Sequence, residues 1–271
     1  MNTLITMNKL MKGCLVVLVL LLSACGAQDV DLKVVMAGQG SITSPGGVDC
    51  EASCTASVKI NPPFIGNKIV KLTATAAPGY EFIGWNHRSC TAAETCDLEF
   101  SGICADQLIC STGLVYFEET IKPVFVDSTI LLDAGWSESA VCAAFSSGEV
   151  QCWPRSANDE VGQVPPLNNP LQVAVAGNAA CAQVDEGVQC WGHPNLIPND
   201  APLLYPPMEM EMLTARVCVI DQEGLKCWGT AGEISTPAVV NPTNLRKQYV
   251  ETPQWSGHQF CVDDDGEPLC W

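Results

Sequence analysis

The chain has 271 residues, of which 13 are basic and 30 acidic, and its formal net charge is −17 at pH 7. This acidic balance disfavours nucleic acids and anionic membrane surfaces as partners. Glycine (22) and proline (18) interrupt short runs of alternating polarity, and long helical periods are absent, so the sequence predicts an all-β protein.

Residues 1–24 have the features of a secretory signal peptide. Two lysines precede an apolar run at 14–22, which is too short for a transmembrane helix of about 20 residues. The run ends in Leu-Ser-Ala-Cys at 22–25, which resembles the bacterial lipobox. The resemblance implies cleavage before Cys25 and acyl chains, palmitate among them, on that residue. The alternative is an ordinary signal peptide with a cysteine near its cleavage site.

A lipid anchor on Cys25 implies a cell-envelope protein, because two or more acyl chains hold a protein stably on a membrane. Gly26 follows the cysteine. An aspartate at that position favours inner-membrane retention in Gram-negative lipoproteins, so the resemblance implies the outer membrane. Residues 25–29 form a short tether, which places the first folded domain close to the bilayer.

Cysteine is unusually frequent, with 16 residues. Apart from Cys14 in the signal peptide and Cys25, 14 remain, and an even number in an exported chain predicts disulfides. A zinc site needs histidine partners, and His87, His193 and His258 lie in no metal-ligand spacing. We therefore expect neither a metal ion nor a cofactor.

Residues 30–126 have the pattern of a small β domain. Strands are expected at 30–36, 69–76 and 80–85, and a last strand at 116–125 closes the domain. Trp85 is expected in the core. Of the connectivities that six cysteines allow, local pairing is favoured because each pair closes one loop, which gives Cys50–Cys54, Cys90–Cys96 and Cys104–Cys110.

Several segments of this domain resemble the divergent internalin B-repeat domain of bacterial surface proteins. They are Gly-Gln-Gly-Ser-Ile-Thr-Ser at 38–44, Gly-Gly-Val-Asp-Cys at 46–50, Val-Lys-Leu-Thr-Ala-Thr-Ala at 70–76 and Gly-Tyr-Glu-Phe-Ile-Gly-Trp at 79–85. The resemblance implies a small β-grasp-like module that serves as a spacer or adhesive unit and carries no catalytic residues.

One motif occurs four times in residues 131–271, with second cysteines separated by 38, 37 and 43 residues. Each copy has two cysteines, a turn between them, and a tryptophan directly after the second cysteine. Folded as a hairpin, with Ser146–Gly148 or Asp265–Gly266 at the turn, a copy sets cysteine against cysteine at a distance where a disulfide closes. The expected pairs are Cys142–Cys152, Cys181–Cys190, Cys218–Cys227 and Cys261–Cys270.

Each tryptophan points to the opposite face of its strand from the cysteine before it. Burial on both faces is typical of a β-propeller blade between two neighbours. The motif, with the small pairs Ala176–Gly177 and Ser256–Gly257 just upstream, resembles bacterial members of the regulator of chromosome condensation repeat family. Thr214–Ala215 departs from the small pair. The family forms a closed ring of more blades and binds proteins through loops on one rim.

Four motifs predict a partial or open propeller, with Thr129–Asp133 as a strand of its first blade. The segment is long enough for about three blades of four strands. Unclosed blades leave a bare face at each end, so we expect either a homodimer through the end blades or a chain truncated relative to longer relatives. The domain holds 18 acidic and 5 basic residues, which argues against chromatin-like partners.

The sequence favours a binding protein over an enzyme. It contains no nucleophile elbow, phosphate-binding glycine loop or paired-histidine motif. Asp263–Asp265 would suggest calcium, but it lacks the alternating oxygen ligands of a known loop and lies at a hairpin tip.

The leading hypothesis is a lipid-anchored envelope protein whose propeller loops, such as 153–166 and 193–207, contact a protein or a glycan. Trp136, Tyr205 and Trp255 lie outside the repeat positions and are the aromatic candidates for contact. The runner-up is a structural or adhesive surface protein without a dedicated ligand, and an unrecognised hydrolase is the third hypothesis.

Cys25→Ala tests the anchor. Without the cysteine thiol no lipid can be attached, so unprocessed precursor is expected to accumulate in a pulse-labelling experiment, and labelled palmitate is expected to be absent from the protein. Cleavage and membrane attachment equal to those of the natural protein would contradict the lipoprotein interpretation.

Overall fold

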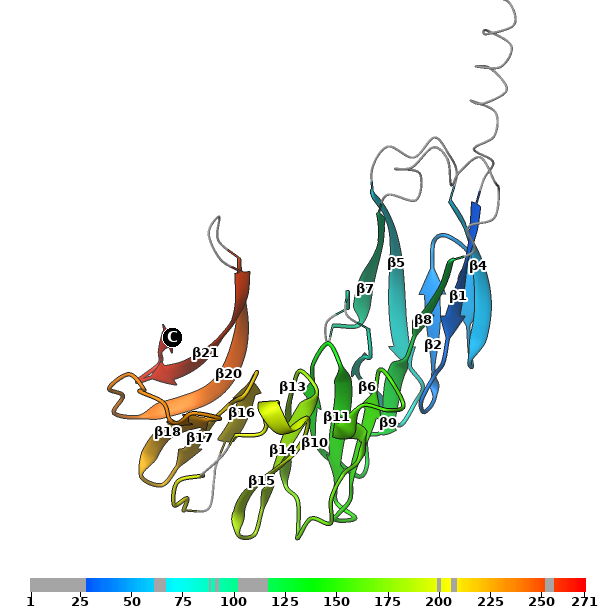
Figure 1. The fold of residues 1–271 in the computed structure, drawn as a ribbon. Coiled ribbons are helices and arrows are strands. Elements are labelled where there is room, and N and C mark those ends of the chain that lie inside the picture. The colour runs from blue at the N-terminus through cyan, green and yellow to red at the C-terminus, as the bar shows by residue number, and fades with distance from the viewer. Residues whose placement is uncertain are drawn as a thin grey trace, which may run out of the picture.

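The computed structural model describes residues 28–60, 67–87, 89–90, 93–101, 117–198, 201–205, 209–251 and 256–271. They form an all-β chain of small sheets that do not close into a barrel. Figure 1 shows an N-terminal module followed by a curved row of sheets. Cys25, Cys104, Cys110 and Trp255 lie outside the described residues. Within the described part, no helix is long and apolar enough to cross a membrane.

Two sheets enclose the core of the N-terminal module. The first has the order β4 (Cys54–Ile60), β1 (Gln28–Val34) and β8 (Phe117–Ile121), and the second has the order β3 (Val48–Cys50), β2 (Gly40–Ser44), β5 (Asn67–Ala76) and β7 (Thr95–Ser101). In β5 the alternation predicted from the sequence buries Val70, Leu72 and Ala74. The core includes Trp85, which has no exposed surface, as expected.

The expected closing strand at 116–125 is wrong in one respect, because the segment forms two strands that belong to different sheets. β8 ends at Ile121, and β9 (Pro123–Asp127) pairs instead with β6 (Tyr80–Trp85). The break falls at Lys122, whose carbonyl accepts the backbone N–H of Asn86, and Pro123 has no N–H to continue a ladder. A two-stranded β6–β9 sheet results.

Each of the four cysteine motifs builds one antiparallel sheet, which we call a blade. The strands are β10 (Leu131–Trp136), β11 (Ala140–Phe145) and β12 (Val150–Pro154) in blade 1; β13 (Gln172–Ala176), β14 (Ala179–Val184) and β15 (Gly187–Gly192) in blade 2; β16 (Glu209–Leu213), β17 (Arg216–Asp221), β18 (Gly224–Gly229) and β19 (Gly232–Glu233) in blade 3; and β20 (Pro242–Glu251), β21 (Ser256–Asp264) and β22 (Glu267–Cys270) in blade 4. The first strands, β10, β13, β16 and β20, pack side by side along the inside of the row.

The structure has four blades, whereas the chain length suggested about three. The blades are smaller than expected, because most have three strands and not four. Part of the segment between blades 1 and 2 forms a short 3-10 helix, η1 (Glu160–Gly162), which packs beside β12 and β15. A second 3-10 helix, η2 (Pro194–Leu196), follows β15. The expected strand at Thr129–Asp133 is present in part, since β10 begins at Leu131 and pairs with β11 in blade 1.

The hairpins have the predicted register, and six of the seven expected disulfides are present, while the seventh, between Cys104 and Cys110, lies outside the described residues. Cysteine faces cysteine in all four blades, with Cα–Cα distances of 4.0, 4.0, 4.1 and 4.1 Å. The turn residues Asp265 and Gly266 have φ values of 51° and 88°, the left-handed conformation of a two-residue hairpin turn. The six disulfides join Cys50 and Cys54, Cys90 and Cys96, Cys142 and Cys152, Cys181 and Cys190, Cys218 and Cys227, and Cys261 and Cys270.

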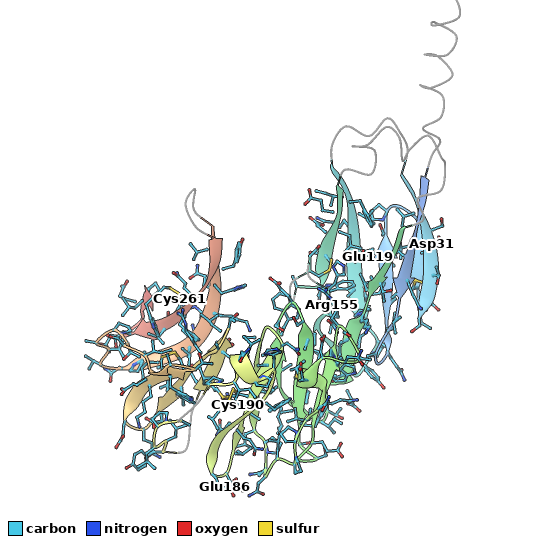
Figure 2. All side chains as sticks on the ribbon, in the orientation of Figure 1. Asp31, Glu119, Arg155, Glu186, Cys190 and Cys261 are labelled. Carbon is cyan, nitrogen blue, oxygen red and sulfur yellow. A yellow bond between two sulfur atoms is a disulfide. The ribbon has the colours of Figure 1, made fainter. Side chains whose placement is uncertain are left out.

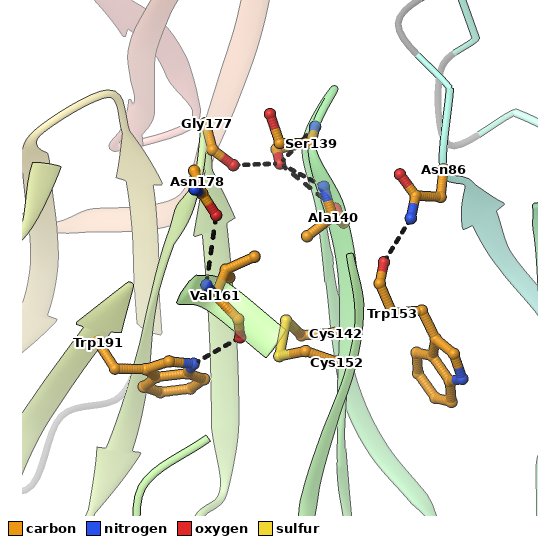
Figure 3. The surroundings of a disulfide bond; sticks show 11 residues. Asn86, Ser139, Ala140, Cys142, Cys152, Trp153, Val161, Gly177, Asn178 and Trp191 are labelled. Atoms are coloured by element: carbon orange, nitrogen blue, oxygen red, sulfur yellow. Dashed lines mark hydrogen bonds between the residues drawn. A yellow bond between two sulfur atoms is a disulfide. The ribbon is translucent and has the colours of Figure 1, made fainter. Parts of the chain in front are cut away.

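The cystine face and the tryptophan face of the blades keep a constant direction along the row. Cys142 of blade 1 faces blade 2, whose Trp191 points back into the same cluster. Cys181 of blade 2 likewise shares a cluster with Trp228 of blade 3. The cystine of one blade therefore faces the tryptophan side of the next, and Figure 3 shows this arrangement around Cys142–Cys152 and Trp191.

The second cysteine of the third motif, Cys227, is more buried than the repeat predicted. The sequence treats the four second cysteines as equivalent, but Cys227 is only 2% exposed, whereas the second cysteines of the other three blades are partly exposed. The reason is local to blade 3, which has the additional strand β19. The N–H of Ile234, just after β19, donates to the Cys227 carbonyl at 2.9 Å, and Phe260 of blade 4 packs in the same cluster.

The tryptophan face of blade 1 is not bare, because the β6–β9 sheet covers it. Ile83, Val124 and Val126 of that sheet pack against Val141 and Phe145 of blade 1. The opposite face of the same sheet belongs to the core of the N-terminal module. One sheet is thus buried between the module and the propeller, which joins them into a continuous structure.

Polar contacts reinforce this junction. The indole N–H of Trp136 donates to the Trp85 carbonyl at 2.9 Å, and Asn86 Nδ2 donates to the Trp153 carbonyl at 2.7 Å (Figure 3). Gly84 lies beneath the Trp136 ring, where an added Cβ would come within 2.7 Å of Cδ1. Only glycine permits this approach.

The cystine face of blade 4, which points away from blade 3, carries polar side chains. Arg246 lies opposite Cys261 and pairs with Asp263 at 2.9 Å, whereas Gly135 and Ala174 occupy the equivalent positions in blades 1 and 2. Gln248 Oε1 lies 3.2 Å from Cys261 Sγ. The expected apolar end face is therefore wrong at both ends of the row, since one is covered and the other is polar.

We expect the chain from Gln28 onward to sediment as a monomer, because neither end face offers the apolar area that would drive a homodimer. The double substitution Arg246→Leu and Asp263→Leu is expected to promote association by making the blade 4 face apolar. A stable dimer of the unsubstituted chain in sedimentation velocity would contradict this expectation.

Candidate functional site

A pocket of about 410 Å³ opens where β10, β13 and β16 end, beside the middle of β20. The ends of β13 and β16 line it with Val175, Met212 and Leu213, of which only Leu213 has any exposed surface. Its rim consists of the turns that lead into β11, β14 and β17 and of parts of β20 and β21. We call it the axial pocket. Its volume falls in the range typical of small-molecule sites.

Lys247 of β20 holds the inner strands together at this pocket. Its Nζ donates to the carbonyls of Trp136 in blade 1 at 2.8 Å and of Val175 in blade 2 at 3.2 Å. It also pairs with Glu211 of blade 3 at 3.4 Å. One side chain of blade 4 therefore contacts all three other blades, and its charge is compensated within the fold.

Two other charged side chains of the pocket are not used by the fold. Within the described part of the chain, no hydrogen bond or ion pair is formed by the side chains of Glu138, in the turn before β11, or of Arg216, at the start of β17. By contrast, Lys226 pairs with Asp221 and Glu223, and Arg246 pairs with Asp263. In so acidic a domain, an arginine without a carboxylate partner is available to an anionic ligand.

His258 lies on the wall of the pocket contributed by β21. Burial lowers the pKa of His258, and the positive charge of Lys247 lowers it further, whereas Glu138 and Glu211 act in the opposite direction. The ring is therefore neutral at pH 7 and can either donate or accept a hydrogen bond. It contacts Tyr249 edge to face, with ring centroids 5.3 Å apart.

The β20–β21 hairpin is longer than the corresponding hairpins of the other blades. β20 has 10 residues and β21 has 9, whereas β16 has 5. In Figure 1 it rises beyond the ends of its neighbours. Tyr249 is 56% exposed on this extension, which prolongs one wall of the axial pocket.

The aromatic candidates from the sequence do not form one site. Trp136 lines the axial pocket, but its indole N–H is already bonded to Trp85. Tyr205 contacts Lys226, whose Nζ lies 5.2 Å from the ring centroid, and its N–H donates to Asp221 at the far end of β17 from Arg216. Trp255 lies outside the described residues.

The segment 153–166, which we expected to contact a partner, is partly structural. Val161 in η1 is completely buried between blades 1 and 2, and its carbonyl accepts the Trp191 indole N–H at 2.9 Å (Figure 3). The calcium alternative also finds no support at Asp263–Asp265, because these carboxylates bind Arg246 and the segment 240–244. Among the described residues, no group of three or more His, Cys, Asp or Glu side chains could hold a metal ion.

A second, smaller and polar pocket lies at the junction between the module and blade 1. It is lined by His87, Glu119, Thr120, Lys122 and Arg155, and Figure 2 labels Glu119 and Arg155 there. His87 Nε2 lies 2.7 Å from Glu119 Oε1, while Lys122 Nζ donates to the Arg155 carbonyl at 2.8 Å. The second of these contacts connects the module to blade 1, whereas the first lies within the module.

Sequence reasoning missed Glu138, Arg216, Lys247 and His258. A signal was available in the pair of residues that lies a few positions before the first cysteine of each motif, such as Ala176–Gly177 and Thr214–Ala215. These pairs contribute to the rim of the pocket. Gly177 in blade 2 has φ 56°, and Ala215 takes the same left-handed conformation, φ 60°, in the pair that departed from the pattern. Such a conformation is unfavourable for alanine.

No protein-family model and no curated protein matches the sequence. Among solved structures, the chain is similar to the CRINKLY WD40 ectodomain of the Arabidopsis thaliana receptor kinase ACR4, with a TM-score of 0.41, 19% identity and 79% of this chain covered. The chain spans 60% of that ectodomain's length. It is also similar to the ectodomain of the Physcomitrella patens receptor kinase CR4, with a TM-score of 0.46, 13% identity, and 91% of this chain and 74% of that chain covered.

Lys247→Met should destabilise the propeller by about 1–3 kcal/mol, because two carbonyls and Glu211 lose their partner while the apolar stem is retained. Arg246→Met is the matched control, since its ion pair with Asp263 is partly exposed and contributes less than about 1 kcal/mol. Urea unfolding with intact disulfides measures both, and equal losses would contradict the bridging role.

Proposed function

We propose that this protein is a lipid-anchored binding protein of the bacterial cell envelope, and that its partner occupies the axial pocket. The lipobox-like sequence at 22–25 supports the anchor. The disulfides support an oxidising compartment outside the cytoplasm.

The observation that carries the binding proposal is the contrast between used and unused charges. Lys247 pairs with Glu211 of blade 3 and Arg246 pairs with Asp263 within blade 4, whereas Glu138 and Arg216 line the axial pocket without an ion-pair partner in the described residues. Unpaired polar groups that converge on a largely apolar concavity are the usual composition of a binding site. The N-terminal module, joined to blade 1 through the β6–β9 sheet, would hold this pocket at a fixed orientation to the anchor.

A variant-controlled capture experiment tests the proposal. The lipidated protein is used as bait in detergent-solubilised envelope, with Glu138→Gln and Arg216→Gln as pocket variants. Glu149→Gln and Arg155→Gln are matched controls, because both residues are exposed and lie outside the axial pocket.

A partner, protein or glycan, is expected with the unsubstituted protein and the controls, and about tenfold less with the pocket variants. Equal capture by all proteins would contradict the pocket as the binding site. Capture of nothing above background would favour the structural or adhesive alternative.

A further inference from the structure

Side chains of neighbouring blades bind backbone groups along the free edges of the inner strands. Asp133 of β10 accepts the N–H of Val173 in β13 at 2.9 Å. Glu209 of β16 likewise accepts the N–H of Leu245 in β20. Lys247 donates to the carbonyls at the ends of β10 and β13. The row of blades thus satisfies several backbone groups that an edge strand would otherwise leave open.

Beyond Lys247, β20 continues without such partners. The N–H and C=O groups of Phe260 in β21 bond to Trp271, so they point away from β20. Backbone groups alternate in direction along an antiparallel pair, so those of His258, two residues earlier, also point away. Lys247 lies opposite Phe260 and Tyr249 opposite His258, and both therefore direct their N–H and C=O groups to the free edge of β20. In the described part of the chain, the N–H and C=O of Tyr249 form no hydrogen bond.

This part of the edge also lacks the features that protect free strands. Proteins protect sheet edges with prolines, bulges, lysines or very short strands. The outer strand β22 of the same blade contains Pro268, β19 of blade 3 has two residues, and the first half of β20 has a bulge between Thr243 and Arg246. Residues 248–250 have none of these features, and Tyr249 is 56% exposed. The hairpin rises beyond the ends of the neighbouring strands (Figure 1), which leaves this edge open to another strand.

We propose that the edge of β20 at 247–251 receives an extended segment of a partner protein as an additional β-strand. N–H and C=O groups that recur at every second residue are matched by the backbone of a strand, whereas a glycan has no donors and acceptors with this repeat. Gln248 lies against the cystine of blade 4, so Tyr249 lies on the opposite face, together with the pocket residue His258. Alternate side chains of the added strand therefore lie on the pocket side. This surface goes beyond the proposed function and does not depend on the charges of the pocket.

Nuclear magnetic resonance of the isotopically labelled chain from Gln28 onward tests the proposal with the capped peptide acetyl-Ser-Val-Thr-Val-Ser-amide. We expect the peptide, at millimolar concentration, to shift the amide signals of Lys247, Tyr249 and Glu251 selectively. The same peptide with all its amides N-methylated is expected to bind about tenfold more weakly or not at all, because it keeps the side chains but cannot donate backbone hydrogen bonds.

Two variants at one position separate the backbone from the side chain. Tyr249→Pro removes the N–H at the free edge, and proline is tolerated there because this N–H takes no part in the β20–β21 ladder. We expect it to weaken peptide binding about tenfold. Tyr249→Ala keeps the N–H and is expected to retain binding, and circular dichroism establishes that both variants are folded.

Absence of these shifts, equal binding of the N-methylated peptide, or equal effects of the two variants would overturn the proposal. A Tyr249 amide signal that shifts with protein concentration alone would assign the edge to a second copy of the chain and would also overturn it.

The capture experiment separates this proposal from the proposed function. If the peptide fails but capture remains sensitive to Glu138→Gln and Arg216→Gln, the strand proposal falls and the proposed function stands. If the peptide pairs with the edge but capture is insensitive to the pocket variants, the strand proposal stands and the pocket is not the binding site.

Discussion

The propeller depends on one local constraint, the cross-strand disulfide that fixes the register of each hairpin. A slip of one residue would exchange the two faces of a strand, because side chains alternate with a period of two. The paired cysteines, such as Cys181 opposite Cys190 and Cys218 opposite Cys227, exclude that slip. With the cystine fixed on one face, the neighbouring tryptophan must lie on the other, so each blade has a defined front and back before any blade contacts another.

That polarity also explains how the row of blades begins and ends. The tryptophan side of blade 1 needs an apolar partner, and the β6–β9 sheet supplies it with Ile83 and Val124. The cystine side of blade 4 is polar instead, because Arg246, which pairs with Asp263, stands where blades 1 and 2 have Gly135 and Ala174. Because the first face is covered and the last face is polar, the row exposes no large apolar face at either end. It can therefore remain open without closing into a ring.

The features that the sequence predicted correctly are local ones. Strand alternation, the turn at Asp265–Gly266, the cystine pairs and the opposite placement of tryptophan all follow from residues within one motif. The errors concern contacts between distant segments. No local pattern shows that 116–125 divides between two sheets, because the division depends on β6 pairing with β9 and on Lys122 reaching the carbonyls after β12.

The axial pocket was beyond sequence reasoning for the same reason. Glu138, Arg216 and His258 are far apart in the chain, and each resembles an ordinary surface residue of its own hairpin. They meet only because the inner strands lie side by side and because Lys247 draws β20 towards β10 and β13. The interaction that stabilises the curvature of the row thus also assembles the pocket: Lys247 binds backbone carbonyls and Glu211, whereas Arg216 and Glu138 line the pocket without an ion-pair partner among the described residues.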